Sequence, residues 1–101
     1  MDQRYRIPPL AALNAFAAFA RTGGIRRAAA ELRVDHAAVS RHMRDLEQML
    51  GITLRDRATG KLTLAGHTYY SQIAPLLEGL ARATADIRQQ TPHLTITCVH
   101  G

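Results

Sequence analysis

Hydrophobic residues recur at helical spacing near the N-terminus of the chain, from about residue 10 onward. Leu13, Phe16 and Ala20 follow one another every three or four residues, which predicts a helix over residues 10–22. Gly23 directly follows this segment and is typical of a helix end. We expect this first helix to contribute to the core of the domain.

Two shorter helical segments follow. An alanine-rich helix is expected over residues 25–32, and a third helix over residues 36–50. Asp35 is a good N-cap for the third helix because its carboxylate can accept from the N–H groups of the next turn. Gly51 stands where a left-handed C-cap is expected. Two helices joined by so brief a turn are typical of a helix-turn-helix.

The pattern then changes to that of a hairpin. Residues 52–54 and 62–64 are short β-forming runs on either side of a charged stretch with its tip at residues 58–60, which predicts a short two-stranded hairpin. Thr63 is expected to cap a fourth helix that runs to about Gln90.

The last segment of the chain has a strand-like pattern. Thr91-Pro92 is expected to end the fourth helix, and residues 94–99 alternate between apolar and polar side chains. No second strand lies nearby to pair with this segment. We therefore expect the chain to be a piece of a longer protein.

The third helix has two different faces when its residues are placed at about 100° intervals. The aliphatic face carries Val39, Met43, Leu46 and Leu50. The opposite face is small and basic, with Ala37, Ala38, Ser40, Arg41 and Arg44. Small residues let the helix backbone approach a surface closely, as a helix in the major groove of DNA does. An ordinary solvated helix also has an apolar and a charged side, so both interpretations stay open.

Composition and charge restrict the function further. The chain has 101 residues and is 47% hydrophobic but only 5% aromatic, which suits one small domain with an aliphatic core. The net charge of +5 arises within residues 1–61, which hold 11 basic and 6 acidic residues, whereas residues 62–101 hold two of each. All basic residues except Lys61 are arginine, which matches phosphates and guanine edges better than lysine. A solvated basic surface would look the same.

Other classes of function find little support. No apolar run is long enough to cross a membrane, and no signal peptide precedes the first helix, so we expect a cytoplasmic protein. His36 and His42 lie about 240° apart around one helix and cannot share a metal ion. The single Cys98 has no catalytic partner nearby in the sequence. We expect no catalysis, no metal and no other cofactor.

One set of residues matches a known family in register. These residues are Ala28-Ala29, Leu32, Val34, Ala38-Val39-Ser40-Arg41, Leu46-Glu47, Leu50-Gly51, Arg57 and Leu62-Thr63-x-x-Gly66. Over about residues 10–99, the chain resembles the N-terminal domain of LysR-type transcriptional regulators. The opening Pro8-Pro9-Leu10 and Leu13-Asn14-Ala15-Phe16 resemble the subgroup that contains the glycine-cleavage activator and β-lactamase regulators.

The resemblance implies a mainly α-helical fold: a winged helix-turn-helix with a short two-stranded wing and a long C-terminal linker helix for dimerisation. Residues 1–64 would form the DNA-binding domain, residues 65–91 the linker helix, and residues 92–101 the start of an effector-binding domain that is missing here. The implied function is sequence-specific binding of double-stranded DNA by a homodimer at a pseudo-palindromic operator, which regulates bacterial transcription. A small-molecule effector would bind only the missing domain. The alternative is a protein-interaction module that uses the linker helix.

The resemblance also implies roles for individual residues. Arg26 and Arg27 occupy positions that contact phosphate, and Arg57 and Lys61 belong to the wing. The positions that face bases in the major groove hold His36, Ala37, Ser40 and Arg41, and Arg44 shares their helix face.

Three features depart from the family pattern. Asp35 would repel phosphate and is therefore interpreted as a cap. Arg55 stands where the family usually has phenylalanine. The wing is about two residues shorter than usual.

The fourth helix carries a heptad seam. The seam consists of Tyr70, Ile73, Leu77, Leu80, Thr84 and Ile87. Its beginning, with Tyr69, could instead pack back onto the helix-turn-helix. Beyond Leu76 the helix should outrun its own domain, and a second copy is the expected partner. Pro75 should bend this helix.

Overall fold

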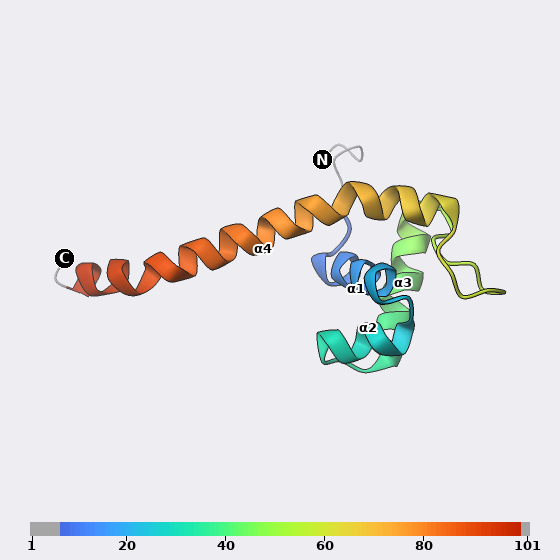
Figure 1. The fold of residues 1–101 in the computed structure, drawn as a ribbon, viewed down its shortest axis with the longest axis horizontal. Coiled ribbons are helices and arrows are strands. Elements are labelled where there is room, and N and C mark those ends of the chain that lie inside the picture. The colour runs from blue at the N-terminus through green and yellow to red at the C-terminus, as the bar shows by residue number, and fades with distance from the viewer. Residues whose placement is uncertain (1–6, 100–101) are drawn as a thin grey trace.

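The computed structural model describes residues 7–99, with side chains described for residues 7–90. Its helices are α1 (Leu10–Thr22), α2 (Ile25–Leu32), α3 (His36–Leu50) and α4 (Leu64–Val99). Helices α1 to α3 form a compact bundle, and α4 crosses this bundle and extends far beyond it (Figure 1). The predicted bounds of the first three helices are confirmed.

Two glycines end helices in the way the sequence predicts. Gly23 and Gly51 adopt the left-handed conformation, with φ of 84° and 70°. The Gly23 N–H donates to the Phe19 carbonyl and the Gly51 N–H to the Glu47 carbonyl, both at 2.8 Å. A side chain at either position would be strained, because L-residues with a Cβ rarely adopt this conformation.

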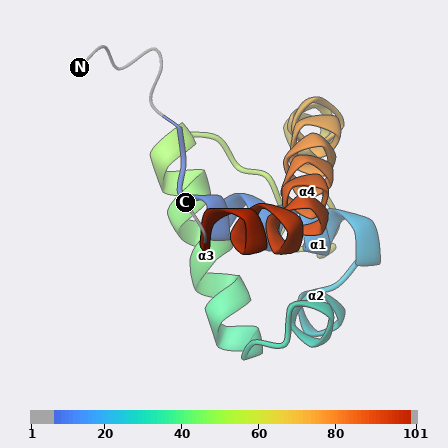
Figure 2. The same ribbon diagram turned by 90° about the vertical axis from the view of Figure 1, so that its left-hand side faces the viewer.

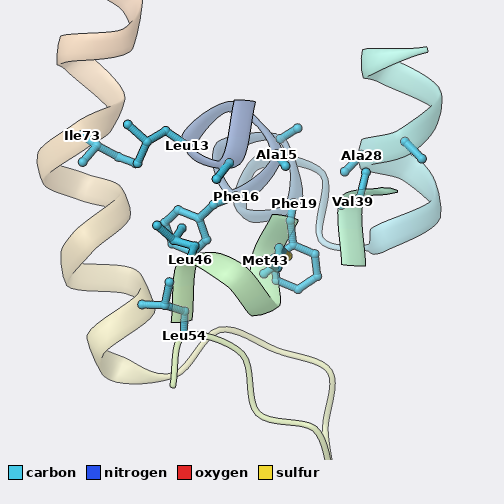
Figure 3. Packing of buried hydrophobic residues seen from close by; sticks show 13 residues of the cluster. Leu13, Ala15, Phe16, Phe19, Ala28, Val39, Met43, Leu46, Leu54 and Ile73 are labelled. Atoms are coloured by element: carbon cyan, nitrogen blue, oxygen red, sulfur yellow. The ribbon is translucent and has the colours of Figure 1, made fainter. Parts of the chain in front are cut away.

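The core lies where the three bundle helices meet the chain that follows them. Phe16 of α1, together with Val39 and Leu46 of α3, is fully buried. Leu54 is equally buried and belongs to residues 52–63, which we call the wing. Figure 3 shows these side chains converging from separate elements. Burial of this aliphatic and aromatic surface ties the wing to the bundle.

The first half of α4 packs across α1. The Phe16 ring lies 5.7 Å from the Tyr69 ring and 6.4 Å from the Tyr70 ring, the latter edge-on. Burial raises the pKa of Tyr69 above its usual value of 10. Every residue from Leu80 to Gln90 is exposed, because α4 has by then left the bundle. Figure 1 shows α4 changing direction along its length, as expected of a helix with Pro75 in its interior.

The two strands predicted for the wing are not confirmed. Within residues 7–99 no strand is present, and the wing holds one isolated antiparallel bridge, between Arg55 and Leu62. The Thr63 N–H donates to the Leu54 carbonyl at 2.9 Å. In a regular antiparallel ladder, the Leu54 N–H would donate back to the Thr63 carbonyl. Here it donates to Glu47 Oε2 at 2.8 Å instead. The Asp56 N–H donates to the Lys61 carbonyl at 2.8 Å, so the bridge has two cross-wing bonds, and a side chain of α3 takes the donor of the next one.

The start of α4 agrees with the sequence analysis, but its end does not. Thr63 Oγ1 accepts from the Gly66 N–H at 3.0 Å, which confirms Thr63 as the cap. The helix continues to Val99, so its predicted end at Thr91-Pro92 and the strand over residues 94–99 are wrong. A strand is stabilised by neighbouring strands, and the described part of this chain supplies none.

Candidate nucleic-acid interface

The N-terminal half of α3 lies on the surface. The turn between α2 and α3 sits on the side of the bundle opposite α4 (Figures 1 and 2). The exposed residues of α3 include His36, Ala37, Arg41 and Arg44, with Ser40 half-buried. Val39, Met43 and Leu46 are buried against the bundle. The prediction of two faces is therefore confirmed, and the small, basic face points to solvent.

Asp35 does not act as the predicted side-chain cap. It occupies the N-cap position of α3 with extended backbone, but its carboxylate makes no capping hydrogen bond. Its Oδ1 lies 3.9 Å from His36 Nδ1, and both side chains are mostly exposed. This geometry arises because the carboxylate turns outward toward His36 rather than back over the first turn. The front of α3 therefore presents a carboxylate next to an imidazole.

The start of α2 offers a second basic surface. Arg26 and Arg27 are both exposed in the first turn of this helix. Gly24 is the N-cap and supplies no side-chain cap, and the first turn contains no acidic residue. The first N–H groups of a helix carry partial positive charge, which adds to the charge of these arginines. The arrangement favours an anion.

Arg57 and Lys61, the two predicted wing contacts, are exposed but differ in their surroundings. Arg57 Nη2 lies 3.5 Å from Glu47 Oε1. Lys61 makes no ion pair within the described residues, and its N–H donates to Thr59 Oγ1 at 3.2 Å. Arg44 and Arg57 line one hollow of about 580 Å³ together with Asp45 and Glu47. The structure thus brings Arg44 close to the wing, in a setting of mixed charge.

Glu47 is a site residue to which the sequence pattern gave no role. Its side chain is only 14% exposed. Glu47 Oε2 accepts from the backbone N–H groups of Leu54 and Arg55, at 2.8 and 3.1 Å, while Oε1 pairs with Arg57. In the sequence, the match of Leu46-Glu47 to the family pattern was the only sign that Glu47 matters, and this match did not say what Glu47 does. Glu47 couples α3 to the wing.

We expect Glu47→Ala to destabilise the fold by about 1–3 kcal/mol, because two part-buried N–H groups lose their acceptor. Thermal unfolding measures this loss, and amide hydrogen exchange at Leu54 and Arg55 should accelerate. Gln48→Ala is the matched control, since Gln48 is the exposed neighbour on the same helix. Unchanged unfolding and unchanged exchange in Glu47→Ala would remove Glu47 from this role.

The predicted heptad seam on α4 divides into two parts. Tyr70 and Leu77 pack against the core of their own domain, and Ile73 is part of that core at 9% exposure. Ile73 is therefore covered by its own domain, whereas Tyr70 and Leu77 are half-buried, and a contact of these three residues with a second copy stays a prediction. Leu80, Thr84 and Ile87 are exposed, as predicted. The periodicity is the same in both halves, and only the position of α1 decides which half is covered.

The exposed apolar face of α4 includes Leu80 of the seam and also residues outside the seam. Leu76 is 68% exposed and Leu80 is 55% exposed, and the two lie one turn apart on one face. Ala83 continues this face and is exposed as well. We call Leu76, Leu80 and Ala83 the linker stripe.

Other kinds of site find no support in the described part of the chain. Among those residues, no group of three or more histidine, cysteine, aspartate or glutamate side chains could hold a metal ion. No helix there is both long and apolar enough to cross a membrane.

Known proteins with similar sequences match most of this chain. The chain is 37% identical over 94 residues to the glycine cleavage system transcriptional activator of Escherichia coli K12, covering 91% of this chain and 31% of that protein. It is 42% identical over 87 residues to the HTH-type transcriptional regulator TrpI of Pseudomonas aeruginosa, covering 84% of this chain and 30% of the relative. The chain thus spans about a third of the length of these curated relatives.

Solved structures with the same fold include two that contain DNA. The BenM DBD in complex with benA site 1 DNA has a TM-score of 0.72 at 28% identity, covering 80% of this chain and 96% of that one. The CbnR DBD–DNA complex has a TM-score of 0.69 at 30% identity, covering 82% of this chain and 98% of that one. Residues 10–67 match the bacterial regulatory helix-turn-helix proteins of the lysR family, which are regulators and not enzymes. Because this match covers more than half of the sequence, the chain belongs to the lysR family of bacterial regulatory helix-turn-helix proteins.

Proposed function

We propose that this chain binds double-stranded DNA in a sequence-specific manner and thereby regulates bacterial transcription. The exposed N-terminal half of α3 carries this proposal. Ala37 and the half-buried Ser40 let the helix backbone approach the floor of the major groove, and Arg41 can reach a guanine edge. The buried Val39 and Met43 hold the helix from behind, so that its front stays rigid.

Further support comes from the surroundings of α3 and from the relatives. Arg26 and Arg27 at the start of α2, and Arg57 and Lys61 in the wing, supply exposed cations on either side of it. These residues suit phosphate contacts, which position a protein on DNA without reading its sequence. Family members of similar fold have been solved in complexes with DNA.

The proposal includes a homodimer formed through the linker stripe. Leu76 and Leu80 are large apolar side chains on a helix that has left its own domain, so water is their only other environment in a monomer. A two-fold pair would present two α3 helices to DNA, about one helical turn or a multiple apart. The matching site is a pseudo-palindrome.

The relatives are about three times as long as this chain, which suggests how the whole protein is regulated. Because the chain spans about a third of them, we infer that a further domain follows residues 92–101 in the whole protein and that an effector binds there. The place of action would be the cytoplasm, where bacterial DNA lies.

Salt dependence of DNA binding tests the proposal. Anisotropy of a labelled duplex of roughly 30 base pairs should show that log K falls linearly with log salt, by about 0.9 for each phosphate contact. Selection from a random DNA pool should then enrich a pseudo-palindromic sequence. A chain that shows no salt-dependent binding to any duplex, but captures another protein through α4, would be an interaction module instead.

Arg41→Ala should weaken binding to the selected sequence by about 1–3 kcal/mol and relax the preference at one base pair, because a bidentate arginine contact discriminates between bases. Binding to random duplex should change less. Arg82→Ala is the matched control, since Arg82 is an exposed arginine on α4 outside the bundle. If affinity and base preference both stay as in the wild type, Arg41 does not read DNA.

A further inference from the structure

A hollow of about 430 Å³ lies between the start of α2 and the wing. Its charged lining residues are Arg26, Arg27 and Arg55, and no carboxylate lines it. The hollow beside Arg44 and Arg57, by contrast, contains both Asp45 and Glu47. The arginine hollow therefore has charges of one sign contributed by two separate parts of the fold. Repulsion among them is relieved when an anion enters.

Arg55 is the inner member of this group. Its Cζ lies 5.9 Å from the centre of the Phe19 ring, which holds the guanidinium beside the bundle. The Arg55 Nε atom is buried without a hydrogen-bond partner, and Arg55 forms no ion pair within the described residues. A buried donor on a charged group is costly when it is left unsatisfied. Nε–H thus has no acceptor within the fold, and the Arg55 side chain lines the hollow, where an anion can meet its charge.

The rest of the lining allows an anion to come close. Gly23, Gly24 and Gly60 line the hollow and add no side chains that would fill it. Gly24 is the N-cap of α2 without a side-chain cap, so the first N–H groups of that helix have no side-chain acceptor. Guanidinium groups with nearby backbone donors are the groups that recognise a phosphate oxygen.

We propose that this hollow binds a phosphodiester group of duplex DNA and that Arg55 contacts it directly. The inference rests on the proposed function and adds to it a residue and a place on the surface. Arg55 joins the start of α2 to the wing through one shared phosphate, so the two elements would hold the same stretch of DNA backbone. A purely structural Arg55 would only cover Phe19.

Three substitutions separate these roles. Arg55→Gln removes the charge, Arg55→Phe removes the charge but keeps a large side chain against Phe19, and Arg55→Lys keeps the charge. With a random duplex of roughly 30 base pairs, the first two should reduce the slope of log K against log salt by about 0.9 and weaken binding about tenfold at 0.1 M salt. Arg55→Lys should retain the wild-type slope. Base preference should stay unchanged in all three, because phosphate contacts carry no sequence information.

Arg82→Gln is the matched control, because it removes one exposed arginine outside the bundle and should leave the slope nearly unchanged. A wild-type slope in folded Arg55→Gln or Arg55→Phe would overturn the proposal for Arg55. It would leave the proposed function intact, whereas a wild-type protein that binds no duplex would end the proposed function itself.

A measurement on the wild-type protein covers the case in which both neutral variants unfold. Because the Arg55 Nε–H is buried, we expect it to exchange slowly with water and to give its own NMR signal. Titration with the random duplex should shift this signal, and inorganic phosphate at the same concentration should shift it far less. A signal that does not move with DNA would contradict a contact at Arg55, and an equal response to phosphate would reduce the hollow to a general anion site.

Discussion

Replacing Leu76 and Leu80 together with glutamate is expected to convert the protein from a dimer to a monomer. The same change should weaken binding to a duplex with two half-sites by about 10²–10⁴-fold, because the second half-site is no longer reached intramolecularly. Leu76 and Leu80 lie one turn apart on α4 and point to solvent, so glutamate there leaves the core intact. Leu77 is unsuitable, since it packs against its own core. Sedimentation gives the mass, and anisotropy gives the affinity.

Glutamate also repels DNA, so the control must add the same charge elsewhere on α4. Ala81→Glu combined with Ala85→Glu does so, since both residues are exposed and lie off the linker stripe. This control should stay dimeric and lose little affinity. An intact dimer after the Leu76 and Leu80 changes, or a monomeric wild type, would show that the linker stripe does not pair two copies.

The local signals in the sequence predict the three bundle helices well. Gly23 and Gly51 end helices through their own backbone conformation, which depends on no distant residue. The two faces of α3 follow equally from periodicity, because Val39 and Met43 must be buried by something. The exposed N-terminal half of α3 is therefore predictable from local sequence alone, whereas the role of Glu47 farther along the same helix is not.

Features that depend on a distant partner could not be placed in this way. The wing pairing stops at one bridge because Glu47, on another element, takes the Leu54 N–H that would form the next cross-wing bond. The heptad on α4 is periodic throughout, yet α1 covers Ile73 and leaves Leu80 exposed. Arg55 looked like the loss of an aromatic packing group, and only the fold shows that it stacks on Phe19 beside two further arginines.

At the junction between the wing and α4, the backbone of the wing packs directly against the first turn of the helix. Gly66 is buried in the first turn of α4, directly after the Thr63 cap. A Cβ built on Gly66 would overlap the carbonyl oxygen of Leu54 and come within 3.1 Å of Leu62 Cδ2. The Leu54 carbonyl cannot move easily, because it accepts from the Thr63 N–H and its own side chain is fixed in the core.

Gly66→Ala should therefore destabilise the protein by about 2–4 kcal/mol, since the strain of overpacking exceeds the gain of about 1 kcal/mol in helix propensity. Thermal unfolding at fixed protein concentration should show a midpoint lower by about 4–8 °C per kcal/mol. Gly79→Ala is the matched control: it lies in the same helix with nothing within 4 Å of a Cβ, and it should raise the midpoint. If Gly66→Ala is as stable as Gly79→Ala, α4 does not press against the wing backbone, and the wing is held by Glu47 and the core alone.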